Sequence, residues 1–96
     1  MKQPRDYALM LLRKAANDLI AADAILQTGK ALDTVGFHAQ QATEKSLKAI
    51  LSFYGVEYPR THDLAQLLTL VLVFVKRKRD HLIVENGPTW VLRAAQ

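Results

Sequence analysis

The chain has 96 residues, of which 50% are hydrophobic and 23% charged, with no cysteine and a formal net charge of +4. This length allows one domain, whose folding buries only about 60–65% of the surface of the unfolded chain. The composition excludes disulfide and thiolate chemistry and argues against a disordered chain, and it fits a folded domain in a reducing compartment, which we take to be the cytoplasm.

The first predicted element is an amphipathic helix over residues 4–28. Pro4 suits the first turn of a helix, where an amide hydrogen is not needed. Small and apolar residues then recur at steps of three and four, which places them on one face. Thr28-Gly29 ends the helix, because glycine readily adopts the left-handed conformation that follows a helix. The recurring residues are Ala8, Leu12, Ala15, Ala16, Leu19, Ala22 and Leu26.

The second predicted helix runs to Tyr54 and is ended by Gly55. Asp33 or Thr34 is expected to cap its start by accepting a hydrogen bond from a free amide. Only about four residues join the two helices, so they should lie antiparallel as a hairpin. More than half of the perimeter of the second helix is apolar or small, which is typical of a central helix packed on more than one side. We therefore expect a homodimer that buries part of this helix or the next.

A polar stripe runs along the second helix. Its members are separated by three or four residues and so share one face. The stripe is either a solvated surface or an anion site, in which two lysines and a histidine would hold a phosphate by charge-assisted hydrogen bonds. The spacing alone does not choose between these interpretations. The candidate ligand-binding residues of the stripe are His38, Gln41, Lys45 and Lys48.

Glu44 lies outside that stripe, among apolar neighbours on the helix. A carboxylate in such surroundings needs a partner if it is buried. One interpretation is a rim position with access to solvent. The other is a polar layer in a subunit interface, where Glu44 would pair with a basic residue or with Gln40 of the symmetry-related copy.

The third predicted helix starts near Thr61, the expected cap, with Asp63 in its first turn. Residues 69–75 are rich in β-branched side chains and alone would suit a strand, but the cap and the basic residues 76–79 favour a helix. Its apolar run, 64–75, is too short to span a bilayer, so no membrane association is expected. The expected apolar face is Leu64, Leu67, Leu68, Val71, Leu72 and Val75.

The sequence becomes less regular beyond Asp80. Residues 86–88 read Asn-Gly-Pro and indicate a turn, and residues 89–96 could form a short last helix. The basic run 76–79 is either a solvated helix end or a contact for nucleic acid or another polyanion. The three histidines lack metal-ligand spacing and there is no glycine-rich phosphate loop, so neither a metal nor a cofactor is expected.

Two sequence blocks, FHAQQATEKSLKAIL at 37–51 and YGVEYPRTHDLAQLL at 54–68, resemble the HEPN domain, the nucleotide-binding domain of higher eukaryotes and prokaryotes. The resemblance covers roughly residues 5–70. It implies an all-α, up-and-down helical bundle that occupies residues 1–96 as one domain and often forms a homodimer. The family tail is not recognisable after about residue 75, so we expect a short or divergent fourth helix.

The resemblance also implies a function. Small prokaryotic members are frequently encoded beside a minimal nucleotidyltransferase in a toxin–antitoxin-like pair. The polar residues that match the family pattern are thereby candidates to face a nucleotide or RNA. They are His38, Gln41, Glu44, Lys45 and Lys48 in the first block, and Arg60, His62 and Asp63 in the second.

Many members of the family are metal-independent ribonucleases, whose motif is an arginine followed, after four to six residues, by a histidine. Here three residues separate Arg77 from His81 and one separates Arg60 from His62. We therefore expect no ribonuclease activity and favour a non-catalytic binding and interaction module. The alternatives are an endoribonuclease that uses Arg77 or Arg79 with His81, and a structural dimer without a ligand. His62-Asp63 could also pair as a base and its orienting carboxylate, although a helix start explains these residues more simply.

Overall fold

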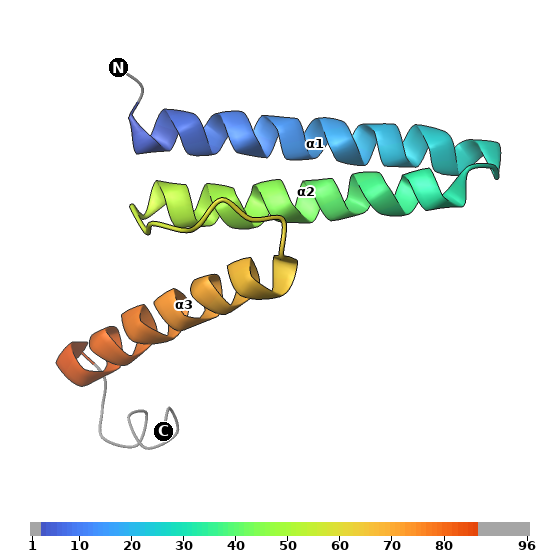
Figure 1. The fold of residues 1–96 in the computed structure, drawn as a ribbon. Coiled ribbons are helices and arrows are strands. Elements are labelled where there is room, and N and C mark those ends of the chain that lie inside the picture. Colours follow the sequence, from blue (N-terminus) through green and yellow to red (C-terminus); the bar gives the residue numbers. More distant parts are fainter. Residues whose placement is uncertain (1–2, 87–96) are drawn as a thin grey trace.

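The three predicted helices are present in the computed structural model, which describes the backbone of residues 3–86 and the side chains of residues 3–81. They are α1 (Pro4–Thr28), α2 (Leu32–Phe53) and α3 (Leu64–Asn86). Helices α1 and α2 form an antiparallel hairpin, and α3 packs beside α2 and diverges from it (Figure 1). The all-α class is thereby confirmed. The short last helix expected at 89–96 lies outside the described residues.

Helix α1 has the bounds that the sequence predicts. The Asp6 carboxylate accepts a hydrogen bond from the backbone amide of Gln3, which precedes the helix. At the other end Gly29 has a φ of 69°, and its amide donates to the carbonyl of Leu26 over 3.0 Å. A residue with a Cβ would be strained in this left-handed conformation, so Gly29 ends the helix as expected.

The cap predicted for α2 is wrong. The helix begins at Leu32, after Ala31 in the left-handed conformation, and no side chain caps it. The amides of Thr34 and Val35 donate to the Ala31 carbonyl instead. Gly29 and Ala31 reverse the chain within a short connection, so Asp33 and Thr34 already lie inside the first turn. The other end lies one residue before the predicted one: the helix ends at Phe53, and Tyr54 and then Gly55, with a φ of 70°, follow it.

The start of α3 also differs from the prediction. Asp63, rather than Thr61, caps the helix, because its carboxylate accepts a hydrogen bond from the amide of Gln66 over 3.2 Å. Thr61 lies two residues before Asp63 in the loop, and its hydroxyl accepts a hydrogen bond from the Asp63 amide over 3.0 Å. The helix then continues through the β-branched run and past Asp80 to Asn86. Tertiary packing and the cap therefore decide the conformation of residues 69–75.

The core consists of two separate sets of side chains. Between α1 and α2 the buried residues are mostly alanines, which allow the two helices to approach closely. Between α2 and α3 the buried residues are Leu51, Leu67 and Val71, and Tyr58 of the connecting loop packs against them. Within the described part of the chain, α3 packs against α2 and not against α1. The first set comprises Ala8, Leu11, Ala15, Ala22, Ala42 and Ala49.

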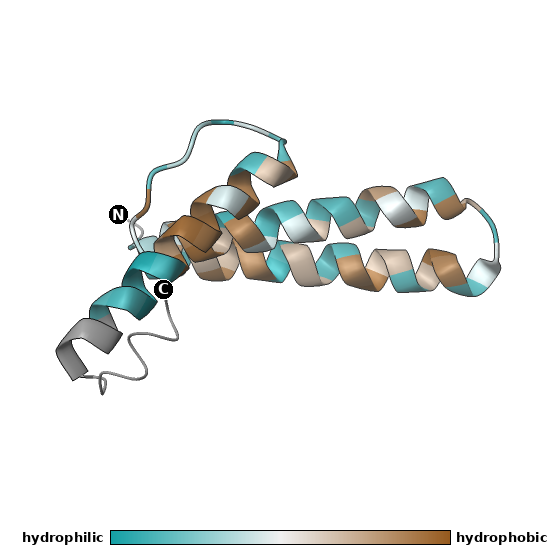
Figure 2. Ribbon diagram, turned by 90° about the horizontal axis from the view of Figure 1, so that it is seen from below, coloured by the Kyte–Doolittle hydropathy of each residue, from teal (hydrophilic) through white to brown (hydrophobic). Residues whose placement is uncertain are grey.

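Much apolar surface stays uncovered on the single chain. Of the face predicted for α3, Leu68, Leu72 and Val75 are about half exposed. Figure 2 shows apolar residues gathered on the first part of α3 and a hydrophilic segment after them. None of the helices in the described residues has the length and apolarity that crossing a lipid bilayer requires.

Candidate functional site

Three residues of the polar stripe on α2, namely His38, Lys45 and Lys48, contact carboxylates of the protein and do not form a freely solvated face. The Nδ1 atom of His38 lies 3.0 Å from one carboxylate oxygen of Asp18 on α1, and the Lys45 ammonium donates to the other. About a quarter of the His38 and Lys45 side chains is exposed, and a smaller fraction of the Asp18 side chain. Lys45 and His38 are therefore committed to holding α2 against α1.

Asp18 is a residue that sequence reasoning missed. It follows the buried Ala15 by three residues and precedes the buried Ala22 by four, so it shares the face of α1 that packs on α2. That spacing was an available signal. The hydrogen bond from Lys45, and then that from His38, holds the pKa of Asp18 below its usual value, although partial burial acts in the opposite direction.

Glu44 forms a second ionic group on the same helix. Only 6% of its side chain is exposed, so the rim interpretation is wrong. One carboxylate oxygen lies 3.1 Å from the Lys48 ammonium and the other 3.0 Å from Nδ1 of His62. Burial raises the pKa of Glu44, but the hydrogen bonds from His62 and Lys48 together outweigh it and hold the pKa below its usual value.

His62 is oriented by Glu44 and not by its neighbour Asp63, which caps α3. The bond engages Nδ1 and leaves 86% of the His62 side chain exposed. Residues 58–62 thereby become attached to α2 at two points, since the Tyr58 hydroxyl also lies 3.1 Å from the Ser52 hydroxyl. The loop that carries Arg60 and His62 is held in a defined position beside Lys48.

These contacts assemble a pocket of about 310 Å³, lined by residues of α1, α2 and the loop before α3. Three of its lining residues, Lys48, Arg60 and His62, are candidates predicted from the sequence. Lys48 comes from α2 and the other two from the loop before α3. The sequence did not indicate the remaining members, which are Tyr7 of α1, Tyr58 and Thr61.

This cationic pocket has the chemistry of an anion site beside aromatic rings. Arg60 supplies a guanidinium group and Lys48 an ammonium group, and such groups bind phosphate oxygens by charge-assisted hydrogen bonds. Tyrosine rings can stack on nucleic-acid bases, and they do so with little dependence on sequence. The combination suits a nucleotide or a single-stranded RNA segment.

The other predicted residues lie elsewhere. His38 and Lys45 bind Asp18, and Gln41 is partly buried on α2 outside the cationic pocket. Arg77 and His81 share a different pocket of about 410 Å³ on α3, which Phe74 and Lys78 also line. Apart from Gln41, the predicted residues thus lie in four places: beside Asp18, in or next to the cationic pocket, at the cap of α3, and in this second basic pocket.

The two depressed carboxyl pKa values predict acid sensitivity. The unfolded chain, with ordinary pKa values of 3.8 for Asp18 and 4.5 for Glu44, binds protons more readily than the folded chain. The stabilisation is therefore complete above these values and is lost as pH falls through the lower folded values. We expect the midpoint of urea unfolding to fall between about pH 5 and about pH 3. The Asp18→Asn variant should show a smaller fall, and an identical fall in both proteins would contradict the prediction.

Comparison with known proteins gives two matches. The family model described as "HEPN domain" matches residues 8–86. A curated protein of Methanocaldococcus jannaschii, named "Putative toxin MJ1304", is 37% identical over 54 residues. The alignment covers 56% of this chain and 35% of that protein, so the chain matches about a third of the length of its relative. No solved structure matches the chain.

Proposed function

Because the chain belongs to the HEPN domain family, we propose that it is a nucleotide- or RNA-binding interaction module that acts with a minimal nucleotidyltransferase in a toxin–antitoxin-like pair. The toxin-like character is supported by the name of the Methanocaldococcus jannaschii relative, which describes that protein as a "Putative toxin". The nucleotidyltransferase partner is what the family resemblance implies.

The proposal that the chain binds a nucleotide or RNA rests on the cationic pocket. Arg60 and His62 are near neighbours in the loop before α3, and the fold places them beside Lys48 of α2 and two tyrosines. Lys48 and His62 already contact the carboxylate of Glu44, whereas Arg60 forms no ion pair with the described residues. Arg60 is therefore the cation most available to a phosphate group.

We also propose that the chain forms a homodimer. The uncovered apolar residues of α3, namely Leu68, Leu72 and Val75, are spaced as one helical stripe and are each about half exposed. Pairing two such stripes about a two-fold axis would remove this surface from water. The dimer interface would then lie on α3, which is one of the two helices on which the sequence led us to expect it.

Titration of an adenosine nucleotide and of a short single-stranded RNA at low salt tests the binding proposal. We expect Arg60→Ala to weaken binding about tenfold, because a hydrogen bond to a charged group contributes roughly 1.5–3 kcal/mol. The melting temperature should stay close to that of the wild type, since Arg60 is exposed. Lys45→Ala should instead leave the affinity unchanged, because Lys45 contacts Asp18 and does not line the pocket.

Arg13→Ala is the matched control, because it removes an exposed arginine of α1 that lines none of the pockets described above. Equal affinity of wild-type and Arg60→Ala protein would refute a ligand in the cationic pocket. The same RNA samples, kept in EDTA, also test the alternative in which Arg77 and His81 cleave RNA. We expect intact RNA, and cleavage that disappears in His81→Ala would favour the ribonuclease.

A further inference from the structure

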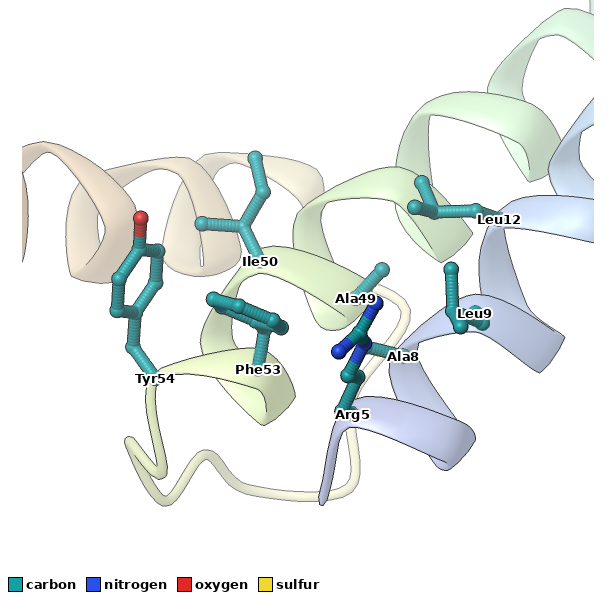
Figure 3. Close-up of a pocket in the computed structure, with 8 residues that line it drawn as sticks. All are labelled: Arg5, Ala8, Leu9, Leu12, Ala49, Ile50, Phe53 and Tyr54. Carbon is teal, nitrogen blue, oxygen red and sulfur yellow. The ribbon is translucent and has the colours of Figure 1, made fainter. Parts of the chain in front are cut away.

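Another pocket, distinct from the cationic pocket and the second basic pocket, lies on the hairpin and is lined almost entirely by apolar residues. It has a volume of about 350 Å³ and opens between α1 and α2, with the buried Ala8 and Ala49 at its base. Figure 3 shows Leu9 and Leu12 of α1 on one side of it and Ile50, Phe53 and Tyr54 of α2 on the other, with the Arg5 side chain reaching in from the start of α1. The large apolar side chains are all more than a third exposed.

This apolar groove continues onto α3 through aromatic contacts. The ring of Tyr54 lies 4.9 Å from that of Phe74, measured between centroids. The Lys78 ammonium in turn lies 5.6 Å above the centroid of the Phe74 ring. Phe74 and Lys78 belong to the second basic pocket, with Arg77 and His81. An apolar groove and a basic pocket therefore form one continuous surface.

The charge on this surface has one sign. Arg5 is the charged residue that lines the apolar groove, and no carboxylate lines either pocket among the described residues. Arg5 and Arg77 form no ion pair with other described residues. The chemistry that suits this surface is therefore apolar side chains over the groove, with negative charge beside Arg5 and beside the basic pocket.

We propose that this surface binds an amphipathic helix of a partner protein, with apolar residues on one face and acidic residues flanking them. Helices of this kind bind in hydrophobic grooves through anchors spaced three and four residues apart. The acidic residues would meet Arg5 in the apolar groove and Arg77 and Lys78 in the basic pocket. The inference is independent of nucleotide binding, because the cationic pocket shares no lining residue with this surface.

Charge and chemistry favour this occupant over two others. A second copy seated here about a two-fold axis would place the same arginines and lysine opposite one another or opposite an apolar groove. RNA phosphates could bind the cations on α3, but the leucine, isoleucine and phenylalanine side chains that line the groove offer them no hydrogen-bond donors. A partner helix with apolar and acidic residues complements both the apolar groove and the basic pocket.

A designed peptide tests the proposal with the full chain. The probe is a fluorescein-labelled helix of about 18 residues, or roughly 27 Å, with leucines at helical spacing and glutamates near both ends. We expect saturable binding by fluorescence anisotropy. Phe53→Asp and Leu12→Asp should each weaken it about tenfold or more, because they remove apolar anchors from different helices. Circular dichroism melting checks that both variants remain folded.

Matched controls are available on the same molecule. Ile20→Asp changes an isoleucine of α1 that is 68% exposed and lines none of these pockets, so binding should not change. Arg77→Ala/Lys78→Ala should weaken binding about fivefold, whereas Arg13→Ala/Lys14→Ala, which removes the same two charge types from α1, should not. A peptide with lysines in place of the glutamates should bind more weakly.

Several results would overturn the inference. The first is absence of peptide binding, or equal binding by the Phe53→Asp and wild-type proteins. A preference for the lysine peptide would also overturn it. Sedimentation that shows a wild-type dimer but a monomer for both Phe53→Asp and Leu12→Asp would place a second copy in the groove. Competition of RNA for the bound peptide, lost in Arg77→Ala/Lys78→Ala, would assign the basic end to nucleic acid.

Discussion

Replacing Glu44 with alanine is expected to lower the free energy of unfolding by about 3 kcal/mol. The substitution removes a buried carboxylate, leaves the Lys48 ammonium without its partner and detaches His62 from α2. A domain of this size is stabilised by roughly 5–15 kcal/mol in total, so the loss is a large share. Urea unfolding followed by circular dichroism measures it directly.

Two further variants test the explanation. Glu57→Ala removes an exposed glutamate of the loop between α2 and α3 and should change stability by less than about 0.5 kcal/mol. Glu44→Ala/Lys48→Met should recover part of the lost stability, because the ammonium that lacks a partner is removed as well. A Glu44→Ala protein as stable as Glu57→Ala would show that the buried ionic group is energetically neutral.

Leu67→Ala should cost about 3 kcal/mol, since a fully buried leucine is replaced and a cavity remains. Leu67 is 0% exposed and joins Leu51 and Val71, the residues that attach α3 to α2. Because α3 does not pack against α1 within the described residues, we expect the loss to be local. Hydrogen exchange should accelerate throughout α3 while the middle of α1 keeps much of its protection.

The matched variant is Leu72→Ala, which truncates the same side chain on the same helix where it is 58% exposed. Its cost should stay below about 1 kcal/mol, because little surface leaves water at that position. Exchange that accelerates equally in α1 and α3 of the Leu67→Ala protein would contradict the prediction, because it would mean that the hairpin and α3 unfold as one cooperative unit.

The helices could be predicted because the apolar pattern of each repeats over many residues, and because a glycine ends a helix through its own backbone conformation. The approximate range 4–28 expected from the sequence coincides with α1, and Gly55, expected to stop the second helix, lies two residues beyond the end of α2. The caps were harder, since several capping residues stand side by side. Asp63 and Thr61 both make cap-type bonds, and only the geometry of the loop decides which one adjoins the helix.

The candidate site was predictable in composition but not in grouping. Helical spacing placed His38, Lys45 and Lys48 on one stripe, yet the first two contact Asp18 while Lys48 joins Glu44. That division depends on how α1 is rotated and shifted against α2, which no local pattern encodes. Tyr7 enters the cationic pocket for the same reason, because it is 41 residues from Lys48 in sequence and adjoins it only through the hairpin.

The packing of α3 on α2 alone has a thermodynamic consequence for any molecule that contacts α3 and the hairpin together. Such a molecule binds best when α3 is docked, so part of its binding free energy depends on the equilibrium between docked and undocked α3. The coupling is reciprocal: binding favours docking, and a change at Leu67, which lines none of the pockets, weakens binding in proportion to the population of docked α3 that it removes. Substitutions of buried residues between α2 and α3 would then change the affinity of this chain for a large partner without touching the binding surface.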